Sequence, residues 1–353
     1  MLTKKQVEEI REHLNKAQTP IFFFDNDPDG LCSFLLLQRY LGRGKGVPIK
    51  SFPELTGDYF RKVHELKADY IFILDKPIVS EEFFKEAEKI NIPVVWIDHH
   101  IVDKNKIPNF INYYNPIFNK PKTEEPVTCL CYQVTNKKDD IWIAVVGCIS
   151  DGFVPDFYDE LEKKYPEMTI KSKKALDILY KSQIGRIARI FNFGLKDRTT
   201  NVINMIRFLV KARSPNEILE ENSKNYAMHQ RFNQIKSVYQ KLLHKAILTE
   251  KKQGKLLFFR YGGDLSITGD LANELTYLFP ERIIVVMYVK GIKANISMRG
   301  KNSRKILLKA IKGLENATGG GHDEAVGGKI NIKDTEKFRE NLEKLFLKQQ
   351  IQK

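Results

Sequence analysis

The feature that most constrains the fold is a series of short segments that are apolar at every position. Residues 20–24, 70–74 and 93–97 are runs of this kind, and helical patterns such as 4–16, 31–40 and 81–89 alternate with them. A strand without a polar face is typical of a parallel sheet covered by helices on both sides. The alternation therefore predicts an α/β fold built on a parallel sheet. A fourth apolar run, residues 141–147, fits either a strand or a helix.

The pattern changes twice in the second half of the chain. Residues 158–247 have a helical and basic pattern, and Ser214-Pro215 predicts the start of one long helix reaching about residue 246. Beyond it we expect strands at 255–260, 282–289 and 294–299, with helices near 269–277, 304–315 and 335–348. These patterns predict three parts: a first α/β domain at 1–200, a helical linker at 201–250 and a smaller α/β domain at 251–353.

The charge is distributed unevenly. The chain of 353 residues has a net charge of +14, yet the first 157 residues contain 20 basic and 23 acidic residues, whereas the remainder contains 38 and 21. A strongly basic half indicates a polyanionic partner, with nucleic acid as the leading candidate, or else a lysine-rich solvated surface. No stretch reaches the roughly 18 apolar residues of a membrane helix, and the N-terminus has no apolar signal core. We therefore expect a cytoplasmic protein that does not act at a membrane.

Acidic residues follow each of the four apolar runs. They are Asp25, Asp27 and Asp29, then Asp75, then Asp98-His99-His100, and finally Asp151. The carboxyl ends of parallel strands open into one crevice, so these side chains should meet there. Crowded carboxylates oppose one another unless cations lie between them. Carboxylate and imidazole ligands suit Mn²⁺ or Mg²⁺, and two such ions can activate water and hold phosphoryl oxygens. Taken singly, each motif could equally be a turn or a helix cap.

A second candidate site lies near the C-terminus. Gly319, Gly320 and Gly321 precede His322, and three consecutive glycines allow backbone N–H groups to approach an anion closely. Arg299 ends a predicted strand and offers a planar fork for phosphate. A flexible turn with an exposed histidine is the structural alternative for this segment.

Together these motifs resemble the DHH phosphoesterases, whose signature is the Asp-His-His seen at 98–100. The resemblance implies a DHH catalytic domain at 1–200 and a DHH-associated substrate-binding domain at 251–353. It implies two Mn²⁺ ions, with Mg²⁺ as a possible substitute, bridged by Asp75. Asp29, His99 and Asp151 would complete one site, and Asp27 with Asp25 the other. Many relatives carry a histidine where Asp25 stands, which leaves the ligand count of the second site open.

The resemblance also implies roles in chemistry and substrate binding. His100 would act near the scissile phosphate together with Asp98. Arg299, the three glycines and His322 would hold the substrate's phosphate or terminal nucleotide. The chain is similar to the compact archaeal RecJ-like exonucleases, some of which work beside replication or repair helicases.

We therefore expect a single-strand exonuclease acting on DNA or RNA, with a 3′→5′ preference, that releases nucleoside monophosphates. The basic half favours long substrates because each neutralised phosphate adds affinity. The alternatives are an oligoribonuclease, a cyclic or linear dinucleotide phosphodiesterase, and a catalytically silent protein that binds a helicase or nucleic acid.

Overall fold

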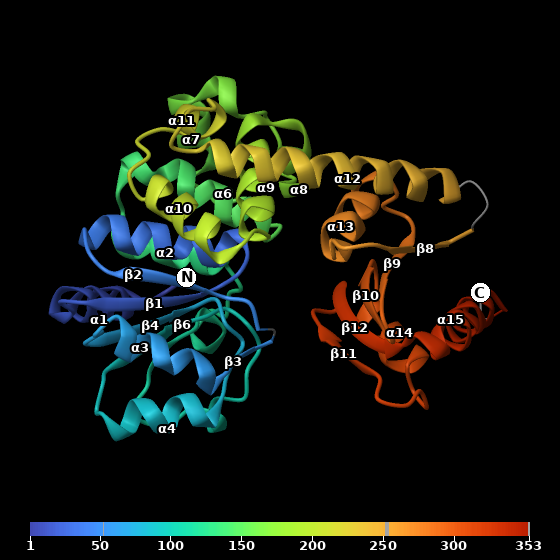
Figure 1. The fold of residues 1–353 in the computed structure, drawn as a ribbon, viewed down its shortest axis with the longest axis horizontal. Helices are drawn as coiled ribbons and strands as arrows, with labels where there is room; N and C mark the ends of the chain where they lie inside the picture. Colours follow the sequence, from blue (N-terminus) through green and yellow to red (C-terminus); the bar gives the residue numbers. More distant parts are fainter. Residues whose placement is uncertain (52, 251–253, 352–353) are drawn as a thin grey trace. The chain divides into compact units, whose positions relative to one another are not determined.

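The computed structural model describes residues 1–51, 53–250 and 254–351. The chain divides into two compact units, Met1–Phe232 and Asn233–Lys353 (Figure 1). The domain borders expected at 200 and 250 stay predictions. None of the described helices is long and apolar enough to cross a membrane.

A five-stranded parallel sheet forms the centre of the first unit and confirms the predicted fold class. The strand order is β2-β1-β4-β6-β7. The central strands are the predicted ones: β1 (Pro20–Asp25), β4 (Tyr70–Leu74) and β6 (Val94–Ile97). The edge strands β2 (Lys45–Ile49) and β7 (Asn112–Tyr114) were not predicted, because they are partly exposed and lack a continuous apolar run. A separate parallel pair joins β3 (Glu54–Leu55) to β5 (Ile78–Val79).

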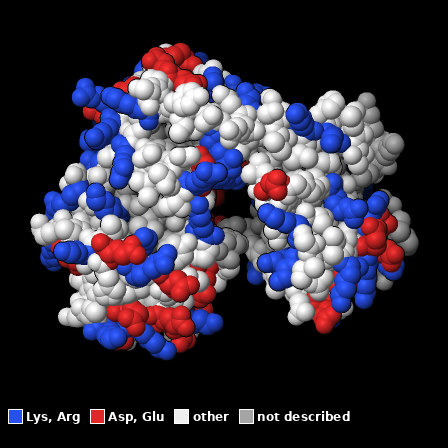
Figure 2. Space-filling view, viewed as in Figure 1, with Lys and Arg blue, Asp and Glu red and all other residues white. Residues whose placement is uncertain are grey.

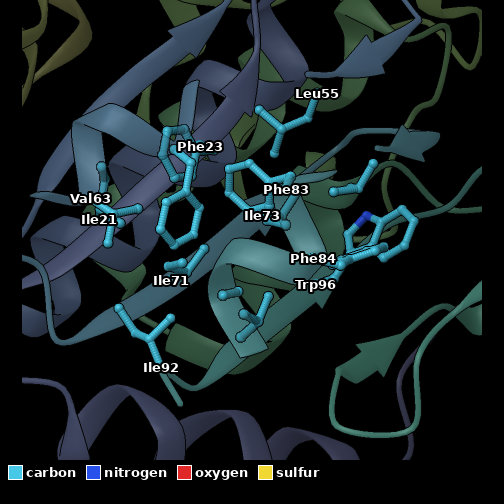
Figure 3. Packing of buried hydrophobic residues seen from close by; sticks show 14 of the residues in the cluster. Ile21, Phe23, Leu55, Val63, Ile71, Ile73, Phe83, Phe84, Ile92 and Trp96 are labelled. Carbon is cyan, nitrogen blue, oxygen red and sulfur yellow. The ribbon is translucent and has the colours of Figure 1, made fainter. Parts of the chain in front are cut away.

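Both faces of this sheet are buried, which is why its central strands have no polar side. On one face, Phe23 and Trp96 pack against Phe83 and Phe84 of α4 (Glu81–Lys89) in the cluster drawn in Figure 3, and α3 (Arg61–Glu65) contributes Val63. On the other face, the rings of Phe22 and Phe24 contact Phe34 of α2 (Pro28–Leu41) at centroid distances of 5.6 and 5.2 Å.

The fourth apolar run is a helix, α6 (Ile141–Ser150). Of the two structures that the sequence left open, the helix is therefore the one adopted, and Asp151 caps its carboxyl end instead of following a strand. All residues from Ile141 to Ile149 are buried, so this helix is apolar on every side and gives no amphipathic signal. It packs beside α2 and α5 (Val127–Thr135), and α1 (Lys4–Lys16) also contacts α5.

The remaining helices of the first unit confirm the helical pattern after residue 157. They are α7 (Tyr158–Lys164), α8 (Ala175–Lys181), α9 (Gln183–Leu195), α10 (Thr199–Leu209) and α11 (Pro215–Leu219), and α12 (Tyr226–Glu250) runs into the second unit. The expectation of one long helix from 214 to 246 is wrong. The buried Asn225 side chain donates to the carbonyl oxygens of Glu217 and Glu220 and accepts from the Asn222 N–H, which fixes a loop between α11 and α12.

The second unit is a mixed sheet with the order β11-β12-β10-β9-β8. The predicted strands correspond to β8 (Leu256–Gly262), β9 (Ile283–Lys290) and β10 (Lys293–Arg299). The helices are α13 (Thr268–Leu278), α14 (Ser303–Ala310) and α15 (Thr335–Ile351). The glycine run is not a flexible turn: it forms the edge strand β11 (Thr318–Gly321), which pairs antiparallel with β12 (Ala325–Asn331).

Candidate metal centre

A tight turn between β1 and α2 gathers the first three aspartates. Asp25 ends the strand, and the side chain of Asp27 caps α2 by accepting the Gly30 N–H at 2.9 Å. A Cβ atom at position 30 would lie 2.5 Å from the carbonyl oxygen of Asp25. Only glycine therefore fits here without displacing the strand end, and the close approach brings the three carboxylates into one loop.

Asp29 has a structural role in addition to its place in the cluster. Its two carboxylate oxygens accept the N–H groups of Val127 and Thr128, at 2.9 and 2.8 Å, in the first turn of α5. A carboxylate at a helix N-terminus is stabilised by the unsatisfied N–H groups and the helix dipole. Asp29 is thus fixed in orientation by a helix that is distant in sequence.

Asp75 follows β4 with a left-handed backbone, at φ 58°. Its N–H donates to the carbonyl oxygen of Ile97, which ties the residue to the end of β6. A positive φ is rarely adopted by a residue other than glycine, asparagine or aspartate, and such strain is found at functional sites. His99 Nε2 lies 3.4 Å from Asp75 Oδ1 and 3.8 Å from Asp151 Oδ2.

Asp98 is fully buried, and its carboxylate forms hydrogen bonds with His100. Its Oδ1 lies 2.8 Å from His100 Nδ1, its Oδ2 accepts the His100 N–H at 3.2 Å, and Tyr113 also donates to Oδ2. The Asn115 side chain donates to the carbonyl oxygen of His100. This network fixes the plane of the imidazole ring and directs Nδ1 towards a carboxylate.

The predicted metal-ligating residues do come together in space. Three sets have ligand atoms within 4.8 Å of one another: Asp29 with His99 and Asp151; Asp25 with Asp27 and Asp75; and Asp75 with His99 and His100. Asp75 belongs to two of these sets and lies between the other groups. That these residues hold metal stays a prediction.

Sequence reasoning missed a lysine in the cluster. The Lys76 side chain is fully buried, and its Nζ donates to Asp25 Oδ1 at 2.8 Å and to the carbonyl oxygen of Ser51 at 2.7 Å. The sequence signal was a lysine directly after Asp75, but Asp75-Lys76-Pro77 has the composition of an ordinary exposed turn.

The electrostatics of the cluster are those of crowded carboxylates. Desolvation, followed by the charge of Asp75, raises the pKa of Asp27 and of Asp29 well above its ordinary value. Asp151 keeps 41% of its side chain exposed, yet the protein around its carboxylate desolvates it enough to raise its pKa to about 6. Burial also raises the pKa of Asp75, but the contact with His99 and its charge bring that pKa below the ordinary value.

The donor set fits divalent cations. Asp75 Oδ1 is buried and accepts no hydrogen bond from the described residues, although it faces His99. A cation in contact with this oxygen would satisfy it and would favour the charged form of every carboxylate whose pKa is raised. Carboxylate oxygens with one or two imidazoles are ligands that suit Mn²⁺ and Mg²⁺.

The substrate-binding candidates lie in the second unit. Arg299 ends β10, and its Nε donates to Asn273 Oδ1 at 2.6 Å, which holds the guanidinium beside α13. Gly319, Gly320 and Gly321 form the exposed edge strand β11, and His322 follows it, also exposed. The structure therefore places Arg299 on β10 and the glycines on β11, the two strands that pair with β12 on either side. Their role in binding stays a prediction.

Comparison with known domains identifies the family. Residues 21–146 match the N-terminal domain of the DHH family, and residues 251–348 match the DHHA1 domain. The chain belongs to the DHH family. It is a DHH phosphoesterase with a C-terminal DHHA1 domain. We call the cluster of Asp25, Asp27, Asp29, Asp75, His99, His100 and Asp151, together with the adjoining Asp98 and Lys76, the DHH centre.

Solved structures share this fold over nearly the whole chain. RecJ of Thermus thermophilus in complex with Mn²⁺ is 15% identical with a TM-score of 0.69, and the match covers 97% of this chain and 54% of RecJ. Exonuclease RecJ bound to manganese is 16% identical with a TM-score of 0.65, and the match covers 98% of this chain and 94% of that protein. The DHH domain of a member of the s1p family of ribosomal proteins is 17% identical with a TM-score of 0.68, and the match covers 98% of this chain and 90% of that domain.

The chain thus spans about half the length of the Thermus RecJ, which has also been crystallised with Mg²⁺. At these identities the likeness shows the fold. A comparison with curated proteins gives no match.

Proposed function

We propose that this DHH protein is a metal-dependent exonuclease that removes nucleoside monophosphates from single-stranded DNA or RNA, with a 3′→5′ preference. The observation that carries the proposal is the DHH centre, in which four separate chain segments supply carboxylates and histidines to three overlapping sets, with the ligand atoms of each set within 4.8 Å of one another. RecJ structures determined with Mn²⁺ and Mg²⁺ support a divalent-cation cofactor, and we propose two Mn²⁺ ions per chain.

Bound cations would supply water activation and neutralise the charge of the scissile phosphate. The protein's own part is to hold them and to place a proton donor. Asp29 and Asp27 are fixed by backbone N–H groups of α5 and α2, so the cluster is preorganised.

His100 is proposed as the proton donor. Burial lowers the pKa of His100, but the hydrogen bond to Asp98 and its charge outweigh burial and raise that pKa above its ordinary value, which favours the protonated ring. It can pass that proton to the leaving oxygen. Asp98 is then a positioning residue that fixes the ring and stabilises its charged form.

The preference for long strands rests on charge. Lys and Arg side chains are spread over the surface of both units, with Asp and Glu among them (Figure 2). Residues 158–353 hold all of the excess positive charge, and each phosphate that they neutralise would release counterions and add affinity. We further propose that Arg299 and the β11 backbone hold the terminal phosphate or nucleotide. A helicase partner stays a prediction from the resemblance.

The deciding experiment is Mn²⁺-dependent digestion of DNA and RNA strands of 2 to 40 nucleotides, labelled at either end. We expect long strands to be degraded to mononucleotides, with a 5′ label giving a ladder and a 3′ label giving free mononucleotide at once. Cleavage confined to the shortest oligomers would replace the proposal by an oligoribonuclease or a dinucleotide phosphodiesterase.

Two variants complete this design. Asp75→Ala removes the carboxylate common to two ligand sets and should abolish cleavage. Asp139→Ala removes a carboxylate that is 81% exposed and outside the centre, and should leave cleavage unchanged. Equal activity of wild type and Asp75→Ala would refute catalysis at the DHH centre.

A further inference from the structure

Lys76, the buried lysine of the DHH centre, is held both at its ammonium group and at its backbone carbonyl. Its ammonium donates to Asp25 and to the Ser51 carbonyl oxygen, and its own carbonyl oxygen accepts the Trp96 Nε1–H at 2.9 Å. Burying an ammonium group is unfavourable unless it is paired and hydrogen-bonded. Here both conditions are met, so Lys76 brings a fixed positive charge into a cluster that is otherwise acidic.

Lys76 contacts one of the two candidate cation sites through its ion pair with Asp25. Asp25 Oδ1 accepts the Lys76 ammonium at 2.8 Å and the Asn26 N–H at 3.0 Å, which leaves Oδ2 as the oxygen of Asp25 that could meet a cation. The set of Asp25, Asp27 and Asp75 thus contains three carboxylates, one of them already in an ion pair.

The other set is better suited to a cation. Asp29, His99 and Asp151 combine two carboxylates with an imidazole, and Asp75 approaches His99 from the side. Asp29 is oriented by the N–H groups of α5, which are neutral donors and leave its negative charge available. A transition-metal ion generally gains from an imidazole ligand, whereas the lysine-paired set has none.

We propose that Lys76 makes the two cation sites of the DHH centre unequal: the Asp29–His99–Asp151 site fills first, and the Asp25–Asp27 site binds a second cation weakly until a substrate phosphate adds its negative charge. This inference rests on the proposed function, because it takes the DHH centre to be the metal site. The lysine repels a cation at the second site and uses part of the charge of Asp25, whereas a substrate phosphate would add negative charge and oxygen donors there.

The test is a Mn²⁺ titration of the metal-free full-length chain, followed by electron paramagnetic resonance and by calorimetry. We expect one tightly bound ion with the spectrum of isolated Mn²⁺, and a second that binds at least tenfold more weakly. The signal of an exchange-coupled pair should appear only with excess Mn²⁺, or at two equivalents when a non-hydrolysable phosphorothioate dinucleotide is added.

Lys76→Met removes the charge and keeps most of the side-chain volume. It should strengthen the second binding step at least tenfold and produce the coupled signal without the dinucleotide. Lys85→Met is the matched control: that lysine is exposed on α4 and pairs with Glu81, so both binding steps should match those of the wild type. Lys76→Arg keeps the positive charge and should keep the two steps unequal.

The outcomes separate this inference from the proposed function. Two ions bound with equal affinity by the wild type would overturn the role of Lys76 and leave the metal-dependent exonuclease standing. A second step unchanged in a folded Lys76→Met variant would overturn it as well. If Lys76→Met does not fold, the inference is still tested by the wild type and by Lys76→Arg, since equal binding steps in either protein would overturn it. Absence of any Mn²⁺ binding would refute both proposals.

Discussion

A buried ion pair joins α2 to the start of α6, the two helices that carry Asp29 and Asp151 of one ligand set of the DHH centre. Arg39, near the end of α2, donates through Nε and Nη2 to Asp140 Oδ1 at 2.9 and 2.7 Å, just before α6 begins. Asp29 lies ten residues before Arg39, and Asp151 lies eleven residues after Asp140, which corresponds to ~15 and ~16 Å along a helix. The ion pair and the cluster thus lie at opposite ends of the same helix pair.

We predict that Asp140→Ala destabilises the first unit by ~3 kcal/mol. Asp140 is 1% exposed and Arg39 10%, and removing one partner of a buried pair typically costs about 3–5 kcal/mol. The lower end applies because Arg39 Nη1 keeps its hydrogen bonds to three carbonyl oxygens at and after the end of α10, those of Leu209, Val210 and Ala212.

Urea unfolding followed by tryptophan fluorescence measures this effect. The chain has two tryptophans, Trp96 and Trp142, and both are buried in the first unit, so the signal reports that unit alone. With a denaturant dependence of about 3 kcal/mol per molar urea, the midpoint should fall by about 1 M.

The neighbouring aspartate provides the control. Asp139 is 81% exposed and pairs with Lys164 at 2.9 Å, and it has nearly the same position relative to the start of α6. Asp139→Ala should leave the midpoint unchanged within scatter, because water replaces an exposed partner. Equal midpoints for the two variants would refute this prediction, because the expected difference comes from the burial of Asp140 and not from its place at the helix terminus.

Three further predictions concern the DHH centre and the second unit. The pKa of Asp151 is raised to about 6, so its protonated form stabilises the metal-free fold at low pH, and this contribution is lost as pH rises through 6. Because a metal ion binds the deprotonated carboxylate, Mn²⁺ affinity should increase from pH 5 to 7.5 and binding should release a proton. Calorimetry in two buffers measures both effects. Gly30→Ala should lower stability by ~1–3 kcal/mol and weaken Mn²⁺ binding, because its Cβ would meet Asp25, whereas Gly254→Ala, with open space around it, should leave Mn²⁺ binding intact. Arg299→Lys should raise KM for long strands and change kcat less; an unchanged KM would exclude the arginine from binding.

Some features were determined by the sequence alone. The short apolar runs at 20–24, 70–74 and 93–97, alternating with helical patterns, predict strands buried on both faces, and parallel strands end at one edge. The acidic residues that follow them had to meet there, so the position of Asp25 and Asp75 in a single cluster followed from periodicity and topology without any contact being known.

Other features were decided by tertiary structure, because they depend on partners distant in the chain. The run 141–147 is a helix that is buried on every side. An all-apolar pattern carries no period that separates helix from strand, so the sequence could not assign this segment. The sequence around Lys76 predicts an exposed turn, yet its ammonium is buried, forms an ion pair with Asp25 and donates to the Ser51 carbonyl oxygen. The glycines at 319–321 became a strand because β12 offers its edge to them. In each case the deciding hydrogen bond or burial comes from a segment that local sequence cannot place.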